Sequence, residues 1–170
     1  MTGVQTCALP ICSTGDAGLG YRALATAHSS PGFYANNALG FEAGRNLNTG
    51  FANIAIGRHA LATTSASTQN IAIGDSAMAG AVSAHTNIGI GYQVLKNYNG
   101  GGFLTYNTAI GYSSQSAASS TVGGANSYFN TSIGGFAMAD NRGGFANTAV
   151  GVSALRFNTD RLWLQCNGLS

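Results

Sequence analysis

A short phrase recurs eight times along this chain, and it constrains the fold more than any other feature. An example is NIAIGRHAL at 53–61. Each copy begins with Asn, or with Asp in the first copy, and continues with a variable residue, a small residue and then one of Ile, Leu or Val. Gly comes next, and after two variable residues the copy ends on a usually small residue and, in most copies, Leu or Met. The glycines of the eight copies are Gly20, Gly40, Gly57, Gly74, Gly91, Gly111, Gly134 and Gly151. Successive glycines are 20, 17, 17, 17, 20, 23 and 17 residues apart. A fixed phrase with a variable remainder is typical of a solenoid, in which the phrase forms a rung and one loop per rung absorbs insertions.

Each copy alternates apolar and small residues, which predicts a short strand. The residue before the glycine is apolar in every copy, and we expect this column in the core: Leu19, Leu39, Ile56, Ile73, Ile90, Ile110, Ile133 and Val150. The small-apolar pair after the glycine, such as Ala60 and Leu61, predicts a second strand across a glycine-led turn. A helix is the alternative for this second element, because YRALATA at 21–27 contains good helix formers.

An asparagine precedes the strand in seven copies, and Asp16 replaces it in the first. The asparagines are Asn36, Asn53, Asn70, Asn87, Asn107, Asn130 and Asn147. Because an amide both donates and accepts, we expect a hydrogen-bonded ladder along the stack, at one corner of each coil. Aromatic residues recur just before the asparagine and are expected to cover this corner by packing. They are Phe33, Phe51, Tyr106, Phe129 and Phe145.

The spacings of 17, 20 and 23 residues differ by three. We expect the extra residues in the return loop, which leads back to the next asparagine, with bulges before Asn36, Asn107 and Asn130. The sixth copy, NTAIGYSSQ, replaces the Ala-Leu pair by Ser114 and Gln115. We therefore expect a bulge in that rung.

The phrase resembles the repeat of the head domains of trimeric autotransporter adhesins. The spellings NTAIGY, NTAVGVSAL and LNTGFANIAIG are especially similar to the same module in bacteriophage tail fibres. The resemblance covers about residues 16–159, although these units are longer than the shortest family repeat. It implies a left-handed parallel β-roll in which three identical chains associate about a common axis.

Both ends lie outside the repeat. Residues 1–12 are interpreted as an artefact and its junction, because TGVQTCALPI at 2–11 looks like the in-frame translation of a sequencing adapter. Residues 13–159 are then the repeat domain, and 160–170 are an aperiodic tail, either a cap or a broken reading frame. We expect the sequence to be a fragment of a longer gene product.

Composition excludes several classes of protein. Of 170 residues, 25 are Gly and 7% are charged, with a net charge of +2, which argues against ordinary disorder. No apolar run approaches the ~18 to 20 residues that span a bilayer, and seven scattered basic residues form no nucleic-acid footprint. The three cysteines lie in or beside the two aberrant ends and indicate no redox compartment.

Titratable residues do not share columns, so we predict no catalytic residue, metal site or cofactor. Glu42 and His59 are the exception, because both lie two residues after the glycine on consecutive rungs. They predict an exposed ion pair worth about 0 to 1 kcal/mol.

The resulting hypothesis is a non-enzymatic structural and adhesive module of a phage tail fibre or bacterial surface adhesin, hence extracellular, with an unknown cell-surface, matrix or glycan receptor. The alternatives are a tailspike-like glycan depolymerase, which needs paired carboxylates, and an ice-binding solenoid, which needs a threonine ladder. Thr108, Thr131 and Thr148 share a column, but Ile54, Ile71 and Ile88 are in it too. A thin coil has little room for all its apolar columns, so we expect part of the Ile and Leu set to be exposed and covered in a homotrimer.

Overall fold

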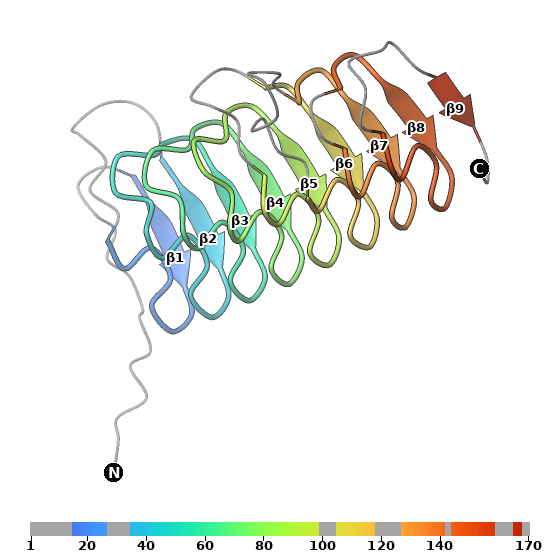
Figure 1. Ribbon diagram of the computed structural model, residues 1–170. Helices are drawn as coiled ribbons and strands as arrows, with labels where there is room; N and C mark the ends of the chain where they lie inside the picture. The colour runs from blue at the N-terminus through green and yellow to red at the C-terminus, as the bar shows by residue number, and fades with distance from the viewer. Residues whose placement is uncertain are drawn as a thin grey trace.

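The computed structural model describes residues 15–26, 35–98, 105–117, 127–141, 144–158 and, for the backbone, 165–167. They form a β-solenoid with one parallel sheet, whose nine strands follow one another in chain order (Figure 1). The strands are β1 (Ala17–Leu19), β2 (Asn37–Leu39), β3 (Ile54–Ile56), β4 (Ile71–Ile73), β5 (Ile88–Ile90), β6 (Thr108–Ile110), β7 (Thr131–Ile133), β8 (Thr148–Val150) and β9 (Gln165–Asn167). The described residues contain no helix, and so none that could cross a membrane.

The strands stay in register whatever the length of the unit. Ile56 pairs with Leu39 seventeen residues earlier, whereas Ile133 pairs with Ile110 twenty-three residues earlier. Bonds between coils also continue past the strand, from Gln115 N to Ala137 O at 3.0 Å. The predicted register is therefore confirmed, and the extra residues lie outside the strand and its turn.

The predicted bulges before Asn36, Asn107 and Asn130 fall on 27–34, 99–104 and 118–126, outside the described residues. The sixth rung itself does not bulge in its described part, 105–117, because β6 pairs in register with both neighbours. Ser114 and Gln115 themselves therefore cause no bulge, whereas the long insertion that follows them lies outside the described residues. Both side chains are accommodated inside the coil instead.

The predicted second strand is also wrong, because the described residues after each glycine form turns. Two of these residues have positive φ in each copy, as at His59 (56°) and Leu61 (51°), whereas strands need negative φ. The turns still bond between coils, through His59 N to Phe41 O at 2.9 Å and Leu61 N to Ala77 O at 2.9 Å. Each described copy thus contributes one strand and one hydrogen-bonded turn.

The pre-glycine column lies on the outside of the coil, contrary to the sequence prediction. Side chains alternate along a strand, and the interior side is occupied by the asparagine before the strand and by the strand's middle residue, as in Asn53 and Ala55. Ile54 and Ile56 must then point outward. The predicted alternation of side chains along the strand is confirmed, but the residues expected inside lie outside, and the small residues between them lie inside.

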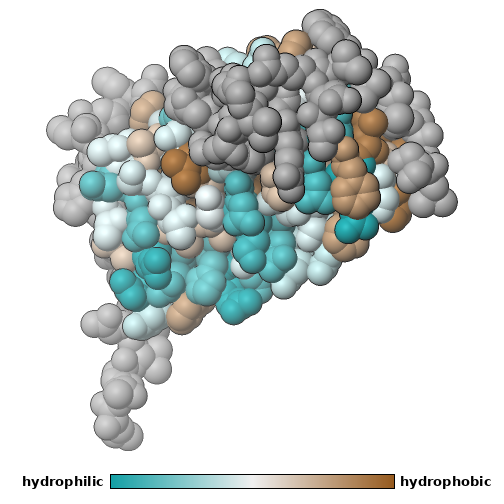
Figure 2. Space-filling view, viewed as in Figure 1, coloured by the Kyte–Doolittle hydropathy of each residue, from teal (hydrophilic) through white to brown (hydrophobic). Residues whose placement is uncertain are grey.

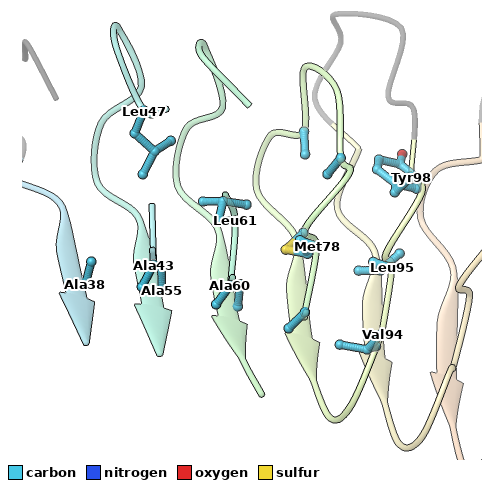
Figure 3. Close-up of a cluster of buried hydrophobic side chains, with 14 of the residues drawn as sticks. Ala38, Ala43, Leu47, Ala55, Ala60, Leu61, Met78, Val94, Leu95 and Tyr98 are labelled. Atoms are coloured by element: carbon cyan, nitrogen blue, oxygen red, sulfur yellow. The ribbon is translucent and has the colours of Figure 1, made fainter. Parts of the chain in front are cut away.

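Small residues fill the strand side of the interior because the turn packs closely against it. Ala55, for example, belongs to the same buried cluster as Ala60 and Leu61 (Figure 3). In the fifth rung, Val94 replaces the usual alanine of the turn, and the strand's middle residue is Gly89. A Cβ on Gly89 would lie 3.2 Å from Val94 Cγ1, so the two positions compensate in volume.

The glycine after each strand is required for two reasons. Gly40 has φ of +136°, a conformation that side chains rarely adopt. A Cβ there would also lie 2.7 Å from the carbonyl oxygen of Gly57 in the next coil. The glycine column therefore allows adjacent coils to approach at this corner.

The ninth strand lies in the tail that the sequence assigned to no repeat. Its pairing of Thr148 with Gln165 continues the seventeen-residue register. The tail contains no copy of the phrase, so only backbone pairing reveals this strand.

Candidate interaction surface

The outward residues of β1–β8 form a surface that we call the outer face. It has two columns, one of which is the pre-glycine column from Leu19 to Val150. The other contains Ala17, Asn37, Ile54, Ile71, Ile88, Thr108, Thr131 and Thr148. The expected exposure of part of the Ile and Leu set is confirmed: Leu19 is 60% exposed, Ile110 36% and Val150 39%.

The outer face is a candidate for association because its apolar residues repeat at every coil. Isolated exposed apolar side chains are ordinary, whereas continuous rows usually mark contact surfaces. In Figure 1 the strands are paler because they lie farther from the viewer than the turns and return segments. Figure 2 is drawn from the same direction, so it shows mainly the side of the molecule opposite the outer face. Hydrophilic residues form a broad band there, among separate apolar patches.

A shallow groove of about 300 Å³ crosses the middle of the outer face. Residues of β4, β5 and β6 form one part of its wall, and residues that precede the strands form the rest. The lining residues are Gln69, Ile71, Thr86, Ile88, Tyr106, Asn107 and Thr108. The groove contains no titratable side chain except the Tyr106 phenol, so it offers shape and apolar contact rather than acid-base chemistry.

Two rows of aromatic side chains flank the strands. Before the strands, Tyr106 stacks on Phe129 at 5.4 Å and Tyr128 on Phe145 at 5.2 Å between ring centroids. Among the predicted corner aromatics, Phe51 is partly exposed, Tyr106 and Phe129 are exposed, and Phe33 lies outside the described residues. Ring packing at this corner is therefore confirmed for Tyr106, Phe129 and Phe145.

The second aromatic row, just after the glycines, was missed from the sequence. Tyr21 stacks on Phe41 and Tyr92 on Tyr112, both at 5.1 Å. The four rings share the position after the glycine with Arg58, Asp75, Gly135 and Val152. The sequence signal for this row is an aromatic residue directly after the glycine in four copies. The row lies beside the pre-glycine residues and extends the exposed apolar surface.

The asparagine column forms the ladder that the sequence predicts, and it lies inside the coil. The Nδ2 of most of them donates to the Oδ1 of the preceding asparagine, at 2.9 Å from Asn53 to Asn36 and at 3.0 Å from Asn70 to Asn53. The backbone N–H of each asparagine donates to the same oxygen, as from Asn87 to Asn70 at 3.0 Å. At the first rung Asp16 Oδ1 accepts from Asn36 N at 2.6 Å.

The ladder is a structural device, because its amides are fully buried. Asn70 Nδ2 also donates to Ala84 O at 2.8 Å, so the amide satisfies a loop carbonyl as well. Burying a polar group without such partners costs on the order of 2 kcal/mol or more. The ladder therefore holds the return segment, which leads from each turn to the next strand, in place beside the strand. Its amides are inaccessible to an external ligand.

The Glu42–His59 pair is not the exposed pair that the sequence predicts. The Glu42 side chain is only 11% exposed, and its carboxylate accepts from Arg45 at 2.6 Å and Arg22 at 3.4 Å. His59 Nε2 lies 3.6 Å from the same carboxylate. The carboxylate is buried because Arg22, on the preceding coil, and Arg45 cover it, and this cluster links the first three coils.

The remaining titratable groups do not converge. A hydrogen bond from Ser76 and the nearby Arg58 lower the pKa of Asp75. Burial lowers the pKa of His85, whose Nδ1 lies 2.8 Å from Thr68 Oγ1. In the described ranges, no group of three or more His, Cys, Asp or Glu side chains could hold a metal ion.

The geometry thus presents a repetitive apolar surface over an interior whose asparagine amides are hydrogen-bonded to one another and to backbone carbonyls. Comparison with known proteins adds no relative: protein-family models, curated proteins and solved structures gave no match to the chain.

Proposed function

We propose that the chain is a non-enzymatic structural segment of an extracellular attachment fibre, from a phage tail or a bacterial surface, and that it works as a homotrimer. The eight-copy phrase and its resemblance to adhesin heads and tail fibres support this proposal. The receptor is a cell-surface, matrix or glycan group contacted by loops of the fibre.

The main support for the proposal is the exposure of the outer face. Its apolar side chains recur at each described coil from Leu19 to Val150, and most of the pre-glycine column is exposed in the single chain. Transfer of apolar area from water stabilises a complex by roughly 25 cal/mol per Å² before the costs of association. A face of this length therefore favours a covered state.

Identical chains are the simplest cover because they have the same axial repeat. Parallel copies arranged by cyclic symmetry can place one coil's Ile or Leu beside the equivalent residue of its neighbours. The stacked strands keep that match along the whole length, since their register does not change between units.

Light scattering on the complete chain tests the proposal. We expect a mass three times the 17.2 kDa of one chain. I110E should reduce the mass toward one chain, because it places a charge on the outer face. V82E is the matched control, since Val82 is also exposed but lies in a return segment, and it should leave the mass unchanged.

A folded monomer at all concentrations would overturn the proposal of a trimer. The choice between phage and bacterium depends on neighbouring genes. Tail and baseplate genes would identify a phage fibre, whereas a secretion signal and membrane anchor in the same gene would identify an adhesin.

A further inference from the structure

Among the described residues, the buried apolar side chains form two clusters along the axis. The larger extends from Ala38 to Ala109, with Leu24 packed against it. The smaller contains Ala137, Met138, Ala149 and Ala154. The division falls between β6 and β7, and three further features of the structure coincide there.

The first feature is a polar plug, formed by Ser114, Gln115 and Ser132. These side chains occupy interior positions that hold Ala, Leu or Met in most other rungs, and all three are fully buried. Ser114 Oγ lies 2.7 Å from Ser132 Oγ, so the two serines satisfy one another. Gln115 is less well satisfied, because its Nε2 has only Met138 Sδ at 3.7 Å and its Oε1 has no partner.

The second feature is a missing link in the asparagine ladder. The other consecutive pairs from Asn36 to Asn147 are joined by an amide-to-amide bond. Between Asn107 and Asn130 the described bond is from the backbone N–H of Asn130, at 2.9 Å. The Asn130 Nδ2 keeps its bond to Gly144 O, which is equivalent to the bond from Asn53 Nδ2 to Ser67 O, so it lacks only the bond to the preceding amide.

The third feature is a second buried polar atom without a partner, Ser127 Oγ, in the segment that leads into β7. A buried polar atom left unpaired opposes folding of the structure around it. Among the described residues, the apolar contacts of the interior are therefore interrupted between the sixth and seventh rungs, and polar groups that are only partly paired take their place.

Contacts on the outside do cross this junction. β6 and β7 keep all three paired residues, and Tyr106 stacks on Phe129 while Tyr112 meets Phe136 edge-on at 5.1 Å. Buried polar bonds cross it as well, from Asn107 Nδ2 to Ser127 O at 2.9 Å and from Tyr98 Oη to the same oxygen at 2.6 Å. The junction is thus held by backbone, surface and polar contacts, with little apolar packing between the described side chains.

We propose that the solenoid consists of two cooperative blocks, 15–117 and 127–158, which meet at a weakened interface, and that the second block opens while the first remains folded. In a stack where each rung contacts only its neighbours, stability is a sum of rung and interface contributions. One poor interface then divides the stack into units that open separately. This inference does not depend on the proposed function.

Native-state hydrogen exchange on the complete chain tests the inference. Amides of 136–141 should exchange at least about tenfold faster than those of 76–81, through openings that leave the first block protected. Because terminal rungs also fray, this difference is necessary but not sufficient.

The decisive comparison is a repaired interface, S114A/Q115L/S132A. It restores the Ala and Leu of other rungs, and Leu is already tolerated at the left-handed φ of this position, as in Leu61 and Leu95. The repair should slow exchange of the second block toward that of the first. Q115L alone should give part of the effect if the triple variant does not fold.

Q93L is the matched control, because it makes the same change at another left-handed position outside both clusters. It should leave the exchange difference unchanged. Uniform exchange in the natural sequence, or a difference that neither repair reduces, would overturn the proposal and leave one cooperative stack with ordinary end fraying.

Discussion

At the scale of single residues, the structure depends on buried polar groups that satisfy one another. Asn70 accepts two bonds from Asn87 through its Oδ1 and donates to Asn53 Oδ1 and to two carbonyls through its Nδ2. An amide is the side chain that can do both. The column is therefore polar although it lies in the interior.

Replacing Asn70 by Ala should be costly. It leaves the backbone N–H of Asn87 without its acceptor, whereas the carbonyl of Ala84 keeps the N–H of Thr68, and a buried unsatisfied group costs about 1 to 3 kcal/mol. We expect a loss of about 1 to 3 kcal/mol in the free energy of unfolding, measured by urea denaturation. Asn97 is exposed, and N97A should change the midpoint little. Equal effects of the two substitutions would refute the role of the ladder.

Tyr98 makes stability depend on alkaline pH. Its hydroxyl donates to Ser127 O at 2.6 Å, and burial raises its pKa to about 12, above the usual 10. The folded state holds this proton more tightly, so the contribution is full below pH 10 and is lost as the pH rises to about 12. Y98F should reduce the dependence of stability on pH in this window. An unchanged slope in Y98F would show that other groups cause the alkaline loss.

At the scale of the rung, the sequence predicted some features and not others for identifiable reasons. The Asn-to-Gly phrase specified the strand positions and their register, because its period is a direct record of stacking. It did not specify which side of the strand faces inward. Ile56 is more apolar than Ala55, and hydrophobicity alone places it inside, but the coil has space only for alanine beside the turn.

The turn was misread for a different reason. Left-handed φ values usually indicate glycine or asparagine, yet His59 and Leu61 adopt them here. Hydrogen bonds between coils hold these residues in place, and a single sequence does not show such bonds. The outer aromatic row and the surroundings of Glu42 also follow from the stacking of several coils.

The compensation between Gly89 and Val94 gives a prediction at this scale. G89A alone should crowd Val94, and V94A alone should leave a cavity that costs about 1 to 3 kcal/mol. The double variant reproduces the Ala and Ala of the neighbouring rung, Ala72 and Ala77, and should be more stable than the sum of the single effects predicts. The coupling energy from denaturation should be about 0.5 to 1.5 kcal/mol. A coupling near zero would mean that the two positions do not share one volume.

At the scale of the whole molecule, we propose that other copies of the chain cover the outer face. Ile110 and Ile133 are exposed in the single chain to a degree that repeats along the stack. In the described residues, a thin coil with an alanine interior has no room for these side chains, so we propose that association buries them.

Attenuation of methyl NMR signals by a soluble paramagnetic probe tests this claim most directly. In the complete chain, we predict that the methyl groups of Ile110 and Ile133 are protected, whereas those of Val82 in a return segment are attenuated. I110E should remove the protection of Ile133. Attenuation of the Ile133 methyl groups equal to that of Val82 in the unmodified chain would contradict the account.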